Sequence, residues 1–104
     1  MKLADLRTAE DLHAESMRDD PEYRREWERT ALAHAVALRL VEYRAAHSLS
    51  QRALARQLGM PQPAIARLEA GEHNPSIATL LRLSRGLAIA FHLDVTPAGV
   101  EFTG

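Results

Sequence analysis

Two glutamines and two arginines in the middle of the chain have the spacing needed to contact DNA. Gln51 and Arg52 open one short predicted helix, and Gln62 and Arg67 lie at the start and in the body of the next one. A glutamine can pair with adenine through two hydrogen bonds, and an arginine can bind guanine or a phosphate. We therefore expect phosphate contacts from Gln51 and Arg52, a base contact from Gln62, and either contact from Arg67. The alternative for Gln51 and Arg52 is a solvated polar face.

Four further residues complete the predicted DNA face. Pro63 and Ala66 offer van der Waals contact to bases, and Asn74 and Ser76 offer phosphate contacts through an amide and free backbone N–H groups. Simple helix capping explains Ser76 equally well. Pro61 and Pro63 are tolerated in the first turn of a helix, but they remove hydroxyl donors from this surface. Direct base readout is therefore expected to be sparse.

Short helices must hold these residues in place. They are predicted at residues 51–58, 61–70 and 77–86. Ser50 and Ser76 can cap the N-termini of the first and third helices. Gly59 and Gly71 can adopt the left-handed conformation that ends the first and second helices. Two short helices joined by a tight turn containing glycine are typical of the helix-turn-helix, whose second helix enters the major groove.

The N-terminal third is predicted to be a helical extension. A helix can start at Thr8, and another at Pro21, after which no proline or glycine interrupts residues 21–46. One helix of about 26 residues is allowed there, with its charged first half projecting from the domain. Tyr23 and Trp27 on that half are candidate partner-binding residues; the alternative is that Trp27 packs on its own domain.

The core is predicted from apolar residues at helical spacing. It includes Val36, Leu54, Leu58, Ile65, Leu68 and Leu80. In the helix at residues 77–86, the inward face is predicted from Ile77, Leu80, Leu81, Ser84 and Leu87.

The last stretch alternates apolar and polar residues across a turn at residues 96–99, which predicts a short β-hairpin. An isolated hairpin is marginal in water, so its apolar face must cover the helices or its edge must pair with a second copy. We expect a homodimer formed through Phe91, Leu93, Val95, Val100 and Phe102.

Charge is distributed unevenly along the chain. Residues 1–30 carry six basic and nine acidic residues, whereas residues 31–85 carry seven arginines against three glutamates. A basic centre is suited to phosphate and acidic ends to another partner. With 46% hydrophobic and 5% aromatic residues, the composition favours a soluble helical domain.

Several classes of function lack the residues that they require. There is no cysteine, which excludes disulfides and thiolate zinc sites, and the five histidines have no metal-ligand spacing. No phosphate loop or nucleophile motif is present. We expect no catalytic residue, metal, cofactor or small-molecule substrate, and hence no enzyme. No apolar stretch resembles a signal peptide or membrane span, so we expect a cytoplasmic protein.

The central residues also resemble a known family. The run LSQRALARQLG at residues 49–59, continued by IARLEAG at residues 65–71 and NPS at residues 74–76, resembles the Xre/Cro–cI class of helix-turn-helix proteins. The resemblance implies an all-α, five-helix lambda-repressor-like domain. It also implies that Glu69 is structural and pairs with an arginine such as Arg39 or Arg44.

The flanking segments narrow the resemblance to HigA-type antitoxins. Residues 1–30 would be an acidic toxin-binding arm, residues 31–90 the DNA-binding domain, and residues 91–104 the dimerisation hairpin. Such a protein binds operator DNA as a homodimer, represses its own operon and neutralises a RelE/HigB-type RNase toxin. Two alternatives stay open: a solitary Xre-type regulator without a toxin, and an interaction module that no longer binds DNA.

Overall fold

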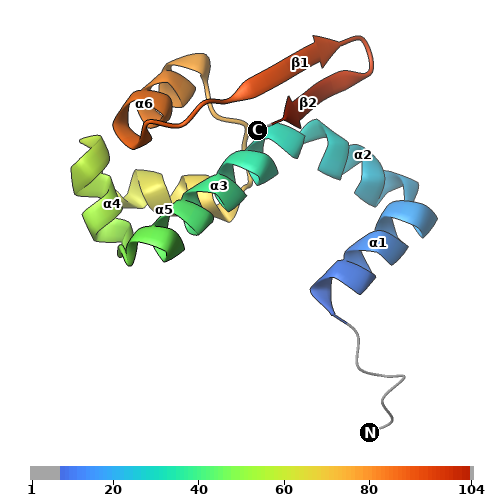
Figure 1. Ribbon diagram of the computed structural model, residues 1–104. Helices are drawn as coiled ribbons and strands as arrows, with labels where there is room; N and C mark the ends of the chain where they lie inside the picture. The colour runs from blue at the N-terminus through green and yellow to red at the C-terminus, as the bar shows by residue number, and fades with distance from the viewer. Residues whose placement is uncertain (1–7, 104) are drawn as a thin grey trace, which may run out of the picture.

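The computed structural model describes residues 8–103, and in them helices surround a core beside one two-stranded sheet (Figure 1). The all-α class with a helical N-terminal extension and a C-terminal hairpin is confirmed. Residues 1–7 of the predicted extension, and residue 104, lie outside the described residues. In order, the elements are α1 (Ala9–Asp19), α2 (Pro21–Arg29), α3 (Ala31–His47), α4 (Gln51–Leu58), α5 (Gln62–Ala70), α6 (Ile77–Leu87), β1 (His92–Thr96) and β2 (Gly99–Thr103).

Residues 31–90 hold four helices and not the five expected from the resemblance. Helix α6 ends at Ala88, whose backbone is left-handed with φ 54°. The Ser84 hydroxyl then donates to the Ile89 carbonyl at 2.6 Å and holds the exit of the chain. The chain leaves the helical layer there and enters the hairpin, so no segment remains for a fifth helix.

The core lies among α3, α4, α5 and α6. Helix α5 packs against α3 and α4, and α6 packs against α4. The predicted core residues are buried, with Leu68 partly so. The largest fully buried side chains are Val36, Leu40, Leu54, Ile65 and Leu83.

The inward face of α6 differs from the predicted one. Leu80, Leu83 and Leu87 are buried, whereas Ile77 and Leu81 are exposed. The reason is a close approach of α4 at Gly86, where any side chain would collide with that of Leu58. Because the helices meet on the Gly86 side, α6 is rotated so that its Ile77 and Leu81 edge faces away from the core.

The hairpin covers the helices with its own apolar face. Leu93 pairs with Phe102 across the two strands, and Phe91 lies 5.7 Å from Phe102 between ring centroids. All three side chains pack against the core, and β2 contacts α3. These three side chains are therefore partly covered within the chain and remain half-buried. Their part in a dimer stays a prediction. Dimerisation through Val95, which is 77% exposed, and Val100 stays a prediction.

The single helix allowed at residues 21–46 is broken at Thr30. Helix α2 ends at Arg29, and Thr30 has φ −109° and ψ 21° before α3 begins. The buried Thr30 hydroxyl donates to the Glu26 carbonyl at 2.9 Å. The prediction of one uninterrupted helix is therefore wrong, and α1 and α2 form a bent arm (residues 8–29) beside the domain (Figure 1).

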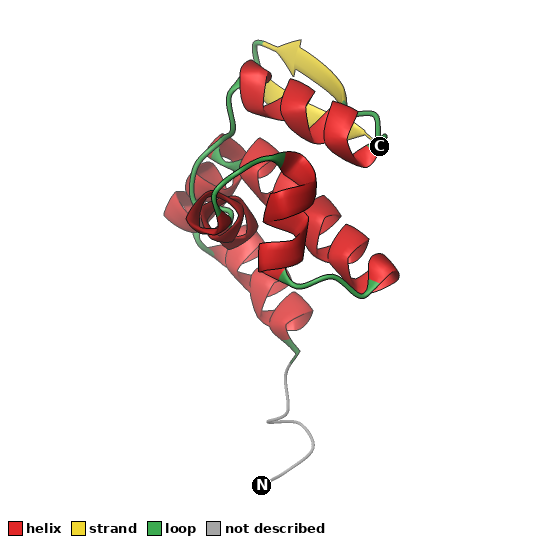
Figure 2. Cartoon of the chain, turned by 90° about the vertical axis from the view of Figure 1, so that its left-hand side faces the viewer, coloured by secondary structure: helices red, strands yellow, loops and turns green. Residues whose placement is uncertain are grey.

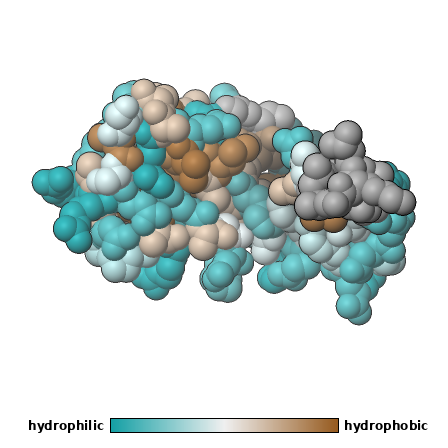
Figure 3. All heavy atoms as spheres, turned by 90° about the horizontal axis from the view of Figure 1, so that it is seen from below, coloured by the Kyte–Doolittle hydropathy of each residue, from teal (hydrophilic) through white to brown (hydrophobic). Residues whose placement is uncertain are grey.

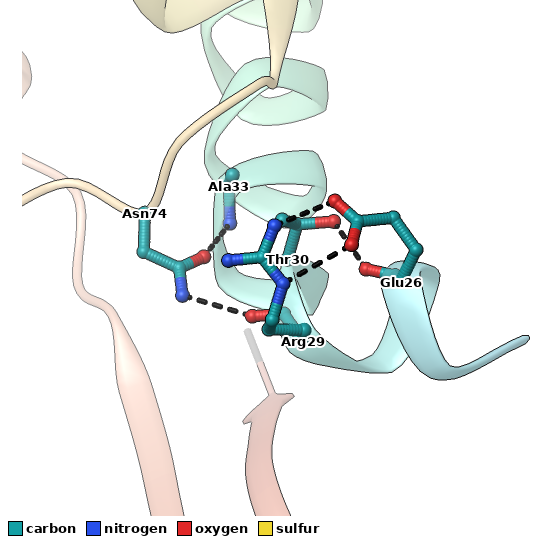
Figure 4. A network of polar contacts seen from close by, with 5 residues as sticks. All are labelled: Glu26, Arg29, Thr30, Ala33 and Asn74. Atoms are coloured by element: carbon teal, nitrogen blue, oxygen red, sulfur yellow. Dashed lines mark hydrogen bonds and ion pairs between the residues drawn. The ribbon is translucent and has the colours of Figure 1, made fainter. Parts of the chain in front are cut away.

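The break is caused by Asn74, which lies 44 residues after Thr30, in the loop before α6. Its Oδ1 accepts from the Ala33 N–H at 3.0 Å, and its Nδ2 donates to the Arg29 carbonyl at 3.0 Å (Figure 4). In an unbroken helix the Ala33 N–H would donate directly to the Arg29 carbonyl. The amide of Asn74 is inserted between them and takes both bonds, which is a recognised cause of a sharp helix kink.

A stack of rings fastens the arm to the domain. His13 of α1 lies against Tyr23 and Trp27 of α2, with its Nδ1 2.7 Å from the Tyr23 hydroxyl. Trp27 in turn stacks on His34 of α3, with ring centroids 3.7 Å apart and planes at 18°. Burial lowers the pKa of His34, the charge of nearby His13 lowers it further, and Glu26 partly opposes both.

We predict that Asn74→Ala destabilises the fold, because the Ala33 N–H and the Arg29 carbonyl lose their partner. The expected loss in the free energy of unfolding is about 1–3 kcal/mol, as measured by urea denaturation. Asn74→Asp keeps the acceptor and should lose about half as much. The exposed neighbour His73→Ala is the control; equal midpoints for Asn74→Ala and His73→Ala would contradict the inserted amide.

We also predict that stability falls as the pH drops through about 6.5, the ordinary pKa of histidine. His34 takes up a proton more readily in the unfolded chain than in the folded one, so acid favours unfolding. Thermal unfolding midpoints at pH 7.5 and pH 5.5 measure the effect. His34→Phe should reduce the difference and His73→Phe should not; an undiminished difference in His34→Phe would show that another group is responsible.

Candidate nucleic-acid interface

Helices α4 and α5 form the predicted helix-turn-helix. The Ser50 hydroxyl caps α4 by accepting from the Ala53 N–H at 3.0 Å, and Gly59 ends the helix with φ 64°. After this turn, α5 begins at Gln62 with Pro63 in its first turn. In Figure 2, which looks from the side of α4, the two short helices cross and are separate from the hairpin.

The two glutamines predicted to contact DNA are bonded to each other. Gln62 Nε2 donates to Gln51 Oε1 at 2.9 Å, so the start of α5 is tied to the start of α4. Gln62 still has its carbonyl oxygen and a second N–H, the acceptor and donor that a paired contact with adenine requires. The structure therefore holds Gln62 in place while leaving its recognition atoms available.

A partly buried ion pair supports these glutamines. Gln51 Nε2 donates to Glu69 Oε1 at 3.2 Å, and Arg44 makes two bonds to the same carboxylate, at 2.7 and 2.8 Å. Arg44 also donates to the Leu49 carbonyl at 3.1 Å. The hydrogen bonds that Arg44 donates to Glu69 raise the pKa of Arg44. Of the two arginines named by the resemblance, Arg44 is thus the partner that the structure pairs with Glu69.

The remaining residues of α4 and α5 on this face point outward. Arg52, Pro63 and Arg67 are exposed, and Ala66 is half-buried. Within residues 8–103 neither Arg52 nor Arg67 has an ion-pair partner, so both charges are available to a phosphate or a base. Arg82 of α6, which the sequence did not indicate, donates to the Gly59 carbonyl at 3.4 Å and adds a positive charge at the turn.

Asn74 has a structural role that the sequence did not indicate. Its Oδ1 and one Nδ2 hydrogen bond to Ala33 and Arg29, so a phosphate contact from this side chain would have to use the second Nδ2 hydrogen, and it stays a prediction. Ser76 caps α6, accepting from the Thr79 N–H at 3.1 Å. A phosphate contact at Ser76 through the free N–H groups of the first turn of α6 stays a prediction.

Tyr23 and Trp27 lie inside the ring stack and are half-buried. Trp27 thus packs on its own domain, as the alternative to a partner-binding role predicted. One face of it still borders a cavity of about 600 Å³ between α2, α3 and the end of α5.

Metal-binding clusters and membrane-spanning helices are both absent from the described residues. No group of three or more histidine, aspartate or glutamate side chains within residues 8–103 could hold a metal ion. No helix in the same range has the length and apolar character needed to span a membrane.

Comparison with known proteins identifies the same region. No curated protein and no solved structure matches the chain. The Helix-turn-helix family matches residues 40–92, which cover about half of the chain and include α4, the turn, α5 and α6. The chain therefore belongs to the Xre-like helix-turn-helix family and is a DNA-binding regulator.

Proposed function

We propose that this regulator is a HigA-type antitoxin without enzymatic activity. As a homodimer in the cytoplasm it represses its own operon, and it neutralises a basic RNase toxin of the RelE/HigB type. The observation that carries the proposal is the acidic arm, which has eight acidic and four basic residues in residues 8–30. It extends to one side of the domain, away from α4, so an arm partner and DNA could bind together (Figure 1).

The DNA half of the proposal rests on the ordered face of α4 and α5. Gln51 and Arg52 would contact phosphates, and Gln62 and Arg67 would contact bases, with Pro63 and Ala66 packed against base edges. Two copies would place two recognition helices in successive major grooves, about 34 Å apart.

An apolar area beside the hairpin supports the homodimer. Ile77 and Leu81 of α6 are exposed, and together with Phe91 and Leu93 they line a shallow cavity of about 200 Å³. Exposed apolar patches of this kind often mark interfaces. A dimer contact here would also protect the neighbouring edge of the hairpin.

A second candidate is a solitary Xre-type regulator. The stacking of Trp27 on His34 favours it, since an arm that packs on its own domain needs no toxin to order it. The two candidates differ in whether the arm has an external partner. The third alternative, an interaction module that does not bind DNA, is distinguished by the DNA-binding experiment.

We predict that Gln62→Ala and Arg67→Ala each weaken binding to the chain's own promoter by about 1–3 kcal/mol. A gel shift at several salt concentrations measures the loss, and Arg67→Ala should also reduce the salt dependence if it contacts a phosphate. Arg85→Ala, which removes a charge near the end of α6, is the control. Equal binding by the Gln62→Ala/Arg67→Ala double variant would refute this recognition surface; no promoter binding by the wild type would favour the interaction module.

We further predict that a basic RelE-like protein encoded next to this chain co-purifies with it. Deleting residues 1–30 should abolish co-purification while promoter binding persists, because the acidic arm supplies the electrostatic complement. Circular dichroism confirms folding of the truncated chain. Undiminished co-purification of the truncated chain would show that the arm is not part of the toxin interface. The absence of a neighbouring gene for a RelE-like protein would favour the solitary regulator.

A further inference from the structure

A cavity of about 600 Å³ lies beside Trp27, outside the hydrophobic core. Its walls include Trp27 of α2, Ala35, Leu38 and Val41 of α3, and Ala70 and Gly71 at the end of α5, with His34 and Glu69 among the polar lining residues. We call it the α2–α3 trough. Figure 3 shows apolar atoms near the middle of the molecule, between the helical domain and the arm, with hydrophilic atoms around them.

The exposed aliphatic side chains of this trough lie outside the hydrophobic core. Helix α3 buries Leu32, Val36 and Leu40 on its inward side, whereas Leu38 is 59% and Val41 43% exposed. They are three residues apart and so share the other side of the helix. Large aliphatic side chains left together at the edge of a cavity are typical of a protein contact.

The charges around the trough indicate what kind of partner it fits. A second cavity of about 330 Å³ shares Trp27 and Gly71 with it and adds Glu72, together with Glu26, whose carboxylate is paired with Arg29 at 2.6 Å. Glu42 lies one turn beyond Leu38 on α3 and is exposed. The arm next to the trough has four more acidic than basic residues in residues 8–30. The apolar floor therefore has acidic surroundings, which complement a basic partner.

We propose that the α2–α3 trough receives an amphipathic helix of a basic partner, with leucine-like side chains on its floor and lysine or arginine toward the acidic rim. This rests on the proposed function, in which the partner is the toxin, and it moves the main contact from the outer arm to the arm–domain junction. A second copy of this chain is a poor occupant, because it would bring a second acidic arm against the first.

The test uses the full chain and synthetic helical peptides of roughly 18 residues without tryptophan. One peptide has a leucine face and lysines, the second has the same leucines with glutamates, and the third has the same lysines with serines in place of leucines. Trp27 is the single tryptophan of the chain, so its fluorescence reports directly on the trough. The leucine–lysine peptide should bind at least about tenfold more tightly than either of the others.

Two variants locate the binding. Leu38→Gln/Val41→Gln should weaken the leucine–lysine peptide by about tenfold or more, and Leu81→Gln, an equally exposed site on α6, should not. Equal binding of the lysine–serine peptide, or no effect of Leu38→Gln/Val41→Gln, would overturn the inference. So would conversion of a dimer to a monomer by this double variant in sedimentation, since a second copy would then cover the trough.

The same variants separate this inference from the proposed function. If Leu38→Gln/Val41→Gln still captures the neighbouring toxin with full affinity, the trough is excluded and the antitoxin function stands. If the wild type captures no neighbouring protein but binds the leucine–lysine peptide in a manner that depends on Leu38 and Val41, the trough stands and the toxin is excluded as its partner.

Discussion

The carboxylate of Glu69 is the charge around which the DNA-binding unit is arranged. Its side chain is only 7% exposed, and a charge so placed destabilises a fold unless it is paired and hydrogen-bonded. Arg44 of α3 and Gln51 of α4 supply those bonds, and Gln51 in turn accepts from Gln62. One acid on α5 therefore connects three helices and orients Gln62, the glutamine that we propose contacts a base, so the same bonds serve stability and the proposed recognition.

Asn74 plays a corresponding part for the arm. It lies just after the recognition helix α5, and its amide replaces a peptide-to-peptide bond between Arg29 and Ala33. This sets the angle at which α2 leaves α3, and the stack of Trp27 on His34 then holds that angle. The loop that follows α5, the second helix of the helix-turn-helix, thus also determines where the acidic arm lies. The two binding regions are joined through a short path of hydrogen bonds and packed rings.

The distribution of charge differs between these regions. Positive charge on Arg52 and Arg67 is exposed on the face of α4 and α5, whereas the arm has twice as many acidic as basic residues. Within residues 8–103, most exposed aliphatic side chains lie elsewhere, at the α2–α3 trough and at the outer edge of α6 and the hairpin, and Leu12 is exposed on α1. A DNA-binding module with two such apolar areas has the surfaces for a dimer and for a protein partner without using its DNA face.

Local signals in the sequence determined the helix-turn-helix itself. Ser50, Gly59, Gly71 and Ser76 are each in the predicted cap or turn position, because caps and left-handed ends depend on the residue type and its immediate neighbours. Only the tertiary structure decided the break at Thr30, since it is made by a side chain 44 residues later. The same holds for the rotation of α6, which follows from the contact between Gly86 and Leu58. The packing of the hairpin and of Trp27 was likewise decided by the tertiary structure. The apolar character of a residue predicts that it will be buried, but the residues that bury it come from elements distant in sequence.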